Sequence, residues 1–306
     1  MIKTERKGDW ILLYTPEKWV GIVLEDLFKT VLFASKKQIH LYKMEKKVLI
    51  NNKPANWNLP LQKEDVIKIH LFHPVPSTII PTFMDIDILY EDDHLIIVNK
   101  KPFIDTHPNV AEDTATLLNG TAFHVLMNGE ERQIKHIHRL DRDTSGCILF
   151  AKHELVGNML DYMLRERKIK RTYIALAHGS FPAKKGTINK PIGRDRHHAT
   201  RRRISQNGKN AITHYKVIAE QKKESLSLIT CSLDTGRTHQ IRVHLSSIGH
   251  PLAGDTLYGG KPIFNRQALH AAKIELIHPI TEEKIECYAP FIDNPAIFSG
   301  FDIYSI

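Results

Sequence analysis

Short apolar stretches separated by polar turns recur along the chain. Leu95–Lys100, Cys147–Ala151 and Ser227–Cys231 have the length and composition of buried strands. Between the second and third of these, Leu160, Met163 and Leu164 recur at helical spacing, which predicts a helix over Glu154–Arg167. Strands and a helix therefore share one region of the chain, and the pattern predicts a mixed α+β fold.

The first 73 residues carry a different pattern and form a candidate first unit. Ser35–Met44 is basic and helically spaced, while Val48–Lys53 and Val66–Ile69 are strand-like. Prolines then cluster in residues 74–85, which is typical of a linker. We therefore expect a first domain at 1–73, a linker at 74–85 and a second domain at 86–306.

One polar segment, His138–Gly146, concentrates candidate chemistry. It combines a histidine, charged residues, two hydroxyls and a glycine, and it leads directly into the apolar run Cys147–Ala151. A polar loop fixed to a buried strand can hold a reactive side chain rigidly, and Asp141 is the candidate. The alternative is a turn whose charges form ordinary surface ion pairs.

A second polar block, Leu233–Leu245, carries two arginines, two histidines and a glutamine after a Thr-Gly turn. Ile241, Val243 and Leu245 alternate with polar residues as in a strand, although helical spacing also fits part of the block. This block is either an amphipathic element with a solvated basic face or the source of an arginine that pairs with Asp141.

Basic residues and one tyrosine also enter the apolar run Arg167–Gly179. Tyrosine in a strand most often packs in the core, and Tyr173 could do only that.

Together these segments resemble the RluA-type family of RNA pseudouridine synthases. The chain matches the family signature HRLDxxTSG at residues 138–146 and most of LxTGRTHQIRxH…GHPLxGDxxYG at 233–259. Residues 171–179 resemble its strand (K/R)xYxALVxG. The loop after Lys100 departs from the family pattern, because Phe103 stands near the position of the expected glycine. The resemblance spans about residues 86–290.

The resemblance implies a fold and roles for individual residues. The second domain would be a mixed, mainly antiparallel sheet flanked by helices and loops. Asp141 would be the catalytic carboxylate, Arg242 its partner (with Arg237 as second choice), and Tyr173 would stack on the target base. We also expect RNA contacts from residues of the matched segments, with bracing of the loop as the alternative role for the first two: His138, Arg139, Arg142, Thr144, Arg171, Arg237, His239 and Gln240.

Residues 1–73 resemble a degenerate S4-like RNA-binding domain, with Asn52 at a position that is usually glycine; the alternative is an appendage without an RNA role. An S4-like domain favours ribosomal RNA as the substrate over transfer RNA. Isomerising uridine to pseudouridine loses no atoms and involves no oxidation, so no cofactor is expected. A monomer is expected, because monomers are common in the family.

Charge and composition agree with an RNA partner. The net charge is +9, and five arginines fall within Arg194–Arg203, a run with the polarity of a loop. No apolar run reaches membrane-spanning length and the first residues lack a signal-peptide core, so we expect no membrane association and a cytoplasmic protein. The three cysteines are far apart and suggest neither a disulfide framework nor zinc.

Two other functions remain open at this point. The chain could be an RNA-binding or ribosome-assembly factor that kept the fold and lost the activity. It could also be a metal-dependent nuclease, although no HxH, HExxH or paired-carboxylate spacing supports a metal site.

Overall fold

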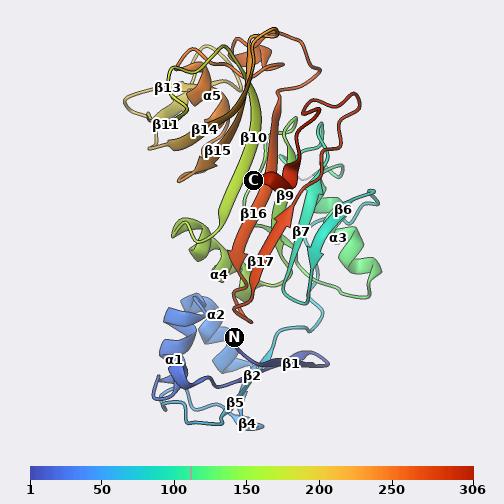
Figure 1. Cartoon of the computed structure of the whole chain (residues 1–306). Helices are drawn as coiled ribbons and strands as arrows, with labels where there is room; N and C mark the ends of the chain where they lie inside the picture. Colours follow the sequence, from blue (N-terminus) through green and yellow to red (C-terminus); the bar gives the residue numbers. More distant parts are fainter. Residues whose placement is uncertain (111) are drawn as a thin grey trace.

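The computed structural model describes residues 1–110 and 112–306, and its strands form two large sheets (Figure 1). A five-stranded sheet and the first helices form the N-terminal unit, which lies at one end of the longer ten-stranded sheet. Most neighbouring strands pair antiparallel, and β9 and β16 pair in parallel. The mixed, mainly antiparallel α+β fold predicted from the sequence is therefore confirmed.

The N-terminal unit has strand order β1-β2-β5-β3-β4. The helix predicted at 35–44 is confirmed, and the Ser35 side chain caps it by accepting a hydrogen bond from Gln38 N–H. The strands predicted at 48–53 and 66–69 are also present, whereas the first two strands were not predicted. The elements are β1 (Thr4–Lys7), β2 (Trp10–Tyr14), α1 (Leu24–Asp26), α2 (Lys36–Met44), β3 (Val48–Ile50), β4 (Lys53–Pro54) and β5 (Val66–His70).

The second unit is built on a sheet with the order β11-β14-β15-β10-β16-β9-β7-β6, to which β17 and β8 add at β16 and β9. Its elements are β6 (Asp87–Glu91), β7 (Leu95–Lys100), α3 (Leu117–Met127), β8 (Lys135–His136), β9 (Ser145–Ala151), α4 (Glu154–Arg165), β10 (Lys170–His178), β11 (Lys185–Asn189), β12 (Ile192–Arg194), β13 (Arg202–Ile204), β14 (Ile212–Gln221), β15 (Leu226–Leu233), α5 (Gln240–Ser246), β16 (Leu269–Ile277) and β17 (Lys284–Tyr288).

The centre of this sheet explains why β7 and β9 are mostly apolar. Every residue of β7 and of β9 is buried, because the sheet is covered on both faces. A strand covered on both faces shows a continuous apolar run instead of alternation. The predicted helix at 154–167 is confirmed as α4, which contacts β9.

Two local predictions need correction. The alternating block after Arg237 is a helix, α5, whose residues from Gln240 to Leu245 are all buried. Its polar side chains are buried because they bond inside the protein, so polarity does not mark an outer face there. The arginine-rich run is a loop only in its middle, because Arg194 and Arg202 pair across the hairpin of β12 and β13.

The N-terminal unit is fixed to the second unit by apolar and polar contacts. The Phe33 ring stacks on Tyr162 of α4 with ring centroids 3.6 Å apart, and Ile2 N–H donates to Thr281 O at 3.0 Å. Apolar residues of both units form one continuous core. Residues 74–85, all of which the structure describes, contain neither helix nor strand and connect the two units.

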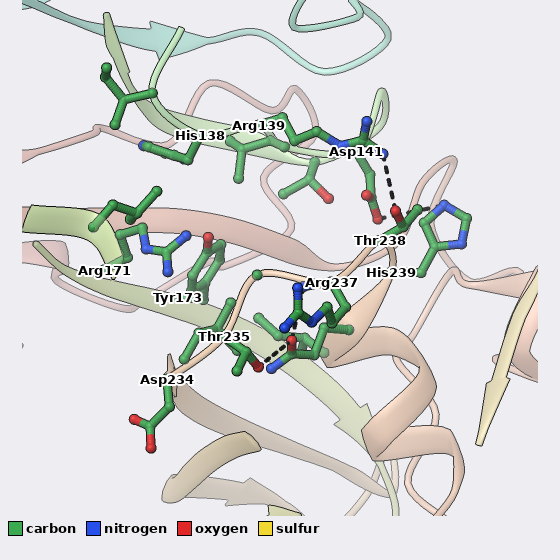
Figure 2. A pocket seen from close by; sticks show the side chains of 18 of the residues that line it. His138, Arg139, Asp141, Arg171, Tyr173, Asp234, Thr235, Arg237, Thr238 and His239 are labelled. Atoms are coloured by element: carbon green, nitrogen blue, oxygen red, sulfur yellow. Dashed lines mark hydrogen bonds and ion pairs between the residues drawn. The ribbon is translucent and has the colours of Figure 1, made fainter. Parts of the chain in front are cut away.

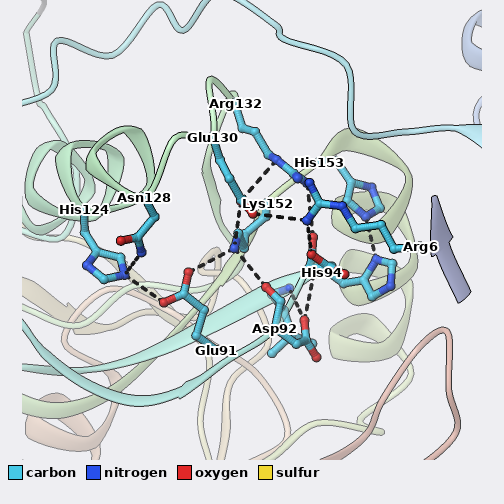
Figure 3. A network of polar contacts seen from close by, with 12 residues as sticks. Arg6, Glu91, Asp92, His94, His124, Asn128, Glu130, Arg132, Lys152 and His153 are labelled. Carbon is cyan, nitrogen blue, oxygen red and sulfur yellow. Dashed lines mark hydrogen bonds and ion pairs between the residues drawn. The ribbon is translucent and has the colours of Figure 1, made fainter. Parts of the chain in front are cut away.

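Figure 3 shows the polar network near this junction. Arg6 of β1 pairs with Asp93 and with Glu130, 3.4 Å away. Lys152, which is buried, lies 2.9 Å from both Glu130 and Glu91. Because Arg6 comes from the N-terminal unit and the other residues from the second, this network ties the two units together.

Within residues 1–110 and 112–306, no helix has the length and apolar character needed to cross a membrane.

Candidate active site

A cavity of about 710 Å³ opens beside the loop between β8 and β9 (Figure 2). Its walls come from five regions: that loop, the end of α4, the start of β10, the turn into α5 with the first residues of that helix, and Leu269 of β16. Asp141 and Tyr173 both line it, and so do six arginine or histidine residues of the predicted set: His138, Arg139, Arg171, Arg237, His239 and Arg242.

The loop that carries Asp141 is held by its own backbone. Thr144 N–H donates to Asp141 O at 3.0 Å, which closes a turn around the aspartate. The Thr106 hydroxyl accepts from Leu140 N–H at 3.2 Å and donates to Leu140 O at 3.1 Å. The Asp141 side chain is 19% exposed, so it can reach the cavity from a fixed backbone.

Arg242 lies against Asp141. Its Nη1 is 3.1 Å from Asp141 Oδ2, while Nε and Nη2 donate to the two oxygens of Asp255 at 2.7 and 2.8 Å. Burial opposes the charge of the guanidinium, but the bonds to Asp255 and the charge of Asp141 outweigh it and raise the pKa of Arg242. Arg242 is therefore a fixed cation, and a cation at this distance stabilises the negative charge of Asp141.

Asp255 was not predicted as a site residue. It is 2% exposed, and the guanidinium of Arg242 binds both of its oxygens in a bidentate pair. The only sequence signal was its place in a Gly-Asp turn of the matched signature. Asp255 fixes the rotamer of Arg242, and so it determines which nitrogen is left for Asp141.

Lys100 contacts the backbone of the loop that carries Asp141, and it was not predicted as a site residue. The ammonium donates to three backbone carbonyls, those of Lys101 at 3.0 Å, Ile104 at 2.7 Å and Arg142 at 2.8 Å. Burial lowers the pKa of Lys100 to about 7, against the effect of nearby carboxylates that include Asp141. The last bond ties the end of β7 directly to the residue that follows Asp141.

Arg266 braces the other end of the loop. Its side chain is fully buried and pairs with Asp293, while Nη1 donates to Asp143 O at 3.1 Å and Nη2 to the Ser145 hydroxyl at 2.9 Å. Nothing in the sequence around Arg266 indicated this role, because its two partners in the loop lie more than 100 residues earlier in the chain.

Glycine is required at the point where the loop enters β9. Gly146 has φ +112°, and a Cβ atom there would lie 2.2 Å from Ala271 O on the parallel neighbour β16. Both the backbone conformation and the close approach exclude larger residues. The glycine of the loop motif therefore brings β9 and β16 together beneath the site.

Tyr173 and Arg171 form the wall opposite Asp141 (Figure 2). Tyr173 is 4% exposed, and burial raises the pKa of its phenol although the nearby Arg171 charge opposes this. The tyrosine thus stays neutral and presents a rigid aromatic wall. Arg171 adds a positive charge to the same wall.

His138 lines the cavity and is 7% exposed. Its Nε2 accepts a hydrogen bond from Leu149 N–H at 3.3 Å, and burial lowers its pKa well below the usual range. The neutral ring braces the loop against β9, which is the alternative role that the sequence left open for it.

The remaining predicted residues divide into two groups. Arg139, whose Nη2 donates to the Thr238 hydroxyl at 3.2 Å, and Arg142, whose Nε donates to Phe103 O at 3.2 Å, lie at the rim. Arg237 donates to Asn210 O at 3.0 Å, so Arg242, not Arg237, makes the contact with Asp141.

Thr144 and Gln240 are turned inward. The Thr144 hydroxyl accepts from Gln267 Nε2 at 3.1 Å. The Gln240 amide bonds four groups of the protein, among them Ile212 O at 2.9 Å and Arg237 N–H at 3.0 Å. These bonds hold the backbone of the site together.

His239 lies between Tyr258 and Asp141. It has the left-handed backbone conformation, with φ +58°, directly before α5. Its Nδ1 is 2.8 Å from the Tyr258 hydroxyl, and its Nε2 is 4.0 Å from Asp141 Oδ2. Burial lowers the pKa of His239, with Arg242 adding to the effect and Asp141 opposing it, so the ring is neutral near pH 7.

A second cavity of about 670 Å³ lies on the other side of Asp141. It shares Arg139, Asp141, His239 and Arg242 with the first, and the arginine-rich hairpin contributes Arg202 to its wall. Across the part of the chain that the structure describes, no group of three or more His, Cys, Asp or Glu side chains is arranged to hold a metal ion.

The arrangement defines what the site can do. An anionic carboxylate stands on a braced loop at the junction of two cavities, with a buried arginine beside it and an aromatic wall opposite. Such a carboxylate can attack an electrophilic carbon or stabilise positive charge on it, and the arginines at the rim can bind a phosphate backbone.

Comparisons with known proteins identify the family of the chain. A family model described as RNA pseudouridylate synthase matches residues 94–247, and one described as the RluD ribosomal pseudouridine synthase N-terminal domain matches residues 12–67. A Bacillus subtilis protein named "Uncharacterized RNA pseudouridine synthase YhcT" is 49% identical over 287 residues, covering 94% of this chain and 95% of that protein.

Ribosomal large subunit pseudouridine synthase D of Neisseria meningitidis is 37% identical over 276 residues, covering 85% of this chain and 73% of that protein. Among solved structures, human RNA pseudouridylate synthase domain containing 1 is similar with a TM-score of 0.56 at 26% identity, covering 68% of this chain and 85% of the human chain. The chain therefore belongs to the RNA pseudouridylate synthase family and is an RNA pseudouridine synthase.

Proposed function

We propose that Asp141 is the catalytic carboxylate of this pseudouridine synthase, that Arg242 pairs with it and orients it, and that Tyr173 faces the target base. The observation that carries the proposal is the 3.1 Å contact of Arg242 with Asp141 in the cavity that Tyr173 lines. The other carboxylates that line this cavity, Asp161 and Asp234, have no buried arginine beside them among the described residues, whereas Arg242 is buried and held in place by its two bonds to Asp255.

The reaction could use the carboxylate in three ways: attack at the sugar C1′, addition at the base C6, or abstraction of a proton. The bond between uracil N1 and ribose C1′ breaks, a bond between C5 and the same C1′ forms, C5 loses a proton and N1 gains one. Positive charge develops at C1′ while the base is detached, and an anion such as Asp141 stabilises that charge or bonds to the carbon. The atoms balance without an oxidant or a cofactor.

The detached base must turn before it bonds again. A flat aromatic face such as that of Tyr173 holds a base by stacking without fixing its rotation about the ring normal. The target uridine must leave its helix to enter a cavity of this kind. Arg139, Arg142, Arg171, Arg237 and His239, which line the two cavities, supply donors and positive charge for the flanking RNA backbone.

Large-subunit ribosomal RNA is the proposed substrate. The support comes from two similarities: the second family model carries the name of a ribosomal synthase, and a relative at 37% identity is named for the large ribosomal subunit. Lys36 and Lys37 on α2 of the N-terminal unit are exposed and offer a basic surface to the same RNA.

The test is pseudouridine mapping at single-nucleotide resolution in cells that lack the gene, complemented with wild type, Asp141→Asn or Asp85→Asn. The last is a matched control, because it makes the same change at an exposed carboxylate outside both cavities. We expect one or more sites in large-subunit ribosomal RNA to vanish on deletion, to return with wild type and Asp85→Asn, and to stay absent with Asp141→Asn.

Three other outcomes of the mapping experiment would contradict parts of the proposal. Sites lost from transfer RNA alone would replace the proposed substrate. Modification by Asp141→Asn at the wild-type level would contradict the role of Asp141. No lost site anywhere, with RNA binding retained in vitro, would favour a binding or ribosome-assembly factor on the same fold.

A further inference from the structure

Tyr258 connects three parts of the protein that meet at the active site. Its hydroxyl oxygen accepts a hydrogen bond from Arg202 N–H of the arginine-rich hairpin at 2.8 Å and lies 2.8 Å from His239 Nδ1. Its ring lies under the guanidinium of Arg242, with Cζ 5.0 Å from the ring centroid. The proposed catalytic machinery does not use Tyr258, although it touches two of the residues around Asp141.

The hydrogen-bond directions in this group are determined by its donors. Arg202 N–H can only donate, and burial raises the pKa of Tyr258 to about 12, so the phenol keeps its single hydrogen. Among the hydrogen bonds of the described residues, the one acceptor available to that hydrogen is His239 Nδ1. Since His239 is neutral, its own hydrogen then resides on Nε2, which is the nitrogen 4.0 Å from Asp141 Oδ2.

The hairpin is itself anchored beside Tyr258. Ile192 of β12 packs with Val243 of α5 and with Ala211 in a small apolar cluster, and Ile204 and Tyr258 complete it. The middle of the hairpin is exposed and basic, with Arg201 paired to Asp195 at its base. A ligand that moves the hairpin on binding would therefore shift Tyr258 through the apolar cluster and through the hydrogen bond from Arg202 N–H.

We propose that Tyr258 is a positioning residue that links the arginine-rich hairpin to the active site, because it fixes His239 with Nε2–H directed at Asp141. The proposal rests on the proposed function of Asp141. The distance of 4.0 Å is too long for a hydrogen bond in the free protein, and catalytic contacts of this length often shorten when the substrate binds.

The first experiment reads the histidine directly. Nitrogen-15 NMR of the full-length wild-type protein reports which nitrogen of His239 carries hydrogen, and the signal is assigned with His239→Gln. We expect the Nε2–H form in wild type and a mixture of forms in Tyr258→Phe, which keeps the ring but loses the hydroxyl. A wild-type signal from the Nδ1–H form would overturn the proposal without any appeal to a variant.

The second experiment measures turnover. Single-turnover pseudouridine formation on saturating RNA should be about tenfold slower in Tyr258→Phe, as expected for the loss of one or two hydrogen bonds at a reacting group, with RNA affinity changed less than about threefold. Tyr90→Phe is the matched control, because it removes a hydroxyl that bonds Asp92 at 2.8 Å outside both cavities. A wild-type rate in Tyr258→Phe, or a slower rate with an unchanged His239 tautomer, would overturn the proposal.

The link to the hairpin has its own test. Arg202→Pro removes both the N–H that donates to Tyr258 and the guanidinium that lines the second cavity, so its rate is compared with that of Arg202→Ala, which removes only the guanidinium. The further loss in Arg202→Pro should be absent when Tyr258→Phe is also present. Additive losses would show that hairpin and tyrosine act separately and would overturn the link. Failure of the wild-type protein to form pseudouridine would contradict the proposed function instead, and the tautomer measurement would still decide the arrangement of His239.

Discussion

Arg242 and Asp255 should be energetically coupled, and the coupling should separate stability from activity. The perturbation is Arg242→Met, alone and together with Asp255→Asn. Arg242→Met keeps most of the side-chain volume but leaves Asp255, which is 2% exposed, as a buried carboxylate without its cation. Asp255→Asn removes that carboxylate charge at nearly constant shape.

The expected size follows from burial. Removing one partner of a buried ion pair costs about 3–5 kcal/mol of unfolding free energy, because the other charge stays buried and uncompensated. Asp255→Asn alone costs less, about 1–3 kcal/mol, because Arg242 keeps Asp141 as a partner 3.1 Å away. In the double variant no unpaired charge is buried at position 255, so it should be more stable than Arg242→Met by roughly 1 kcal/mol or more.

The assay is urea unfolding of the four proteins with linear extrapolation, accompanied by single-turnover rates. Asp85→Asn combined with Arg242→Met is the control, and its effect should be additive because Asp85 is exposed. The double variant should regain stability but not activity, because Asp141 still lacks its arginine. If Asp255→Asn lowered the stability of Arg242→Met further, the reasoning about the buried charge would be refuted.

Two further predictions concern the framework of the site. Gly146→Ala should lower both the melting temperature and the soluble yield, because its Cβ would lie 2.2 Å from Ala271 O; a melting curve like that of wild type would contradict the close approach of β9 and β16. Acid should destabilise the protein, because burial lowers the pKa of His94 and of His270 to about 4 while an unfolded histidine titrates near 6.5. Between these values the unfolded chain binds protons that the folded chain does not, so the free energy of unfolding should fall by up to about 1.4 kcal/mol per pH unit for each group as pH falls from about 6.5 toward 4. The urea midpoint should fall with it, and a constant midpoint would refute this.

Much of the local structure follows from the sequence because it depends on neighbouring residues. Continuous apolar runs predicted β7 and β9, and helical spacing predicted α4. The polar motif before β9 identified the loop of Asp141, and its agreement with a family signature indicated the activity. The strand β1 was not predicted, because most of its residues are exposed and only pairing with β2 makes them a strand.

Tertiary structure decided which polar residues share the site. Both Arg237 and Arg242 stand in the same signature, and only the turn into α5 brings Arg242 against Asp141 and directs Arg237 to Asn210. The alternating block gave an ambiguous period because buried polar side chains of α5 bond inward.

The supporting residues were not recognised from the sequence. Lys100 and Arg266 donate to Arg142 O and Asp143 O, which lie 42 and 123 residues away along the chain. Asp255 pairs with Arg242 only 13 residues before it, and its place in the matched signature did not reveal that pairing. Hydrophobic periodicity indicates which side of a helix or strand is buried, but it does not indicate hydrogen bonds between distant segments. The sequence by itself therefore determined the continuous apolar strands, the helix α4, the position of the polar loop before β9 and the family. Packing of the sheet and α5 determined the ion pairs, because charges are paired by distance in space.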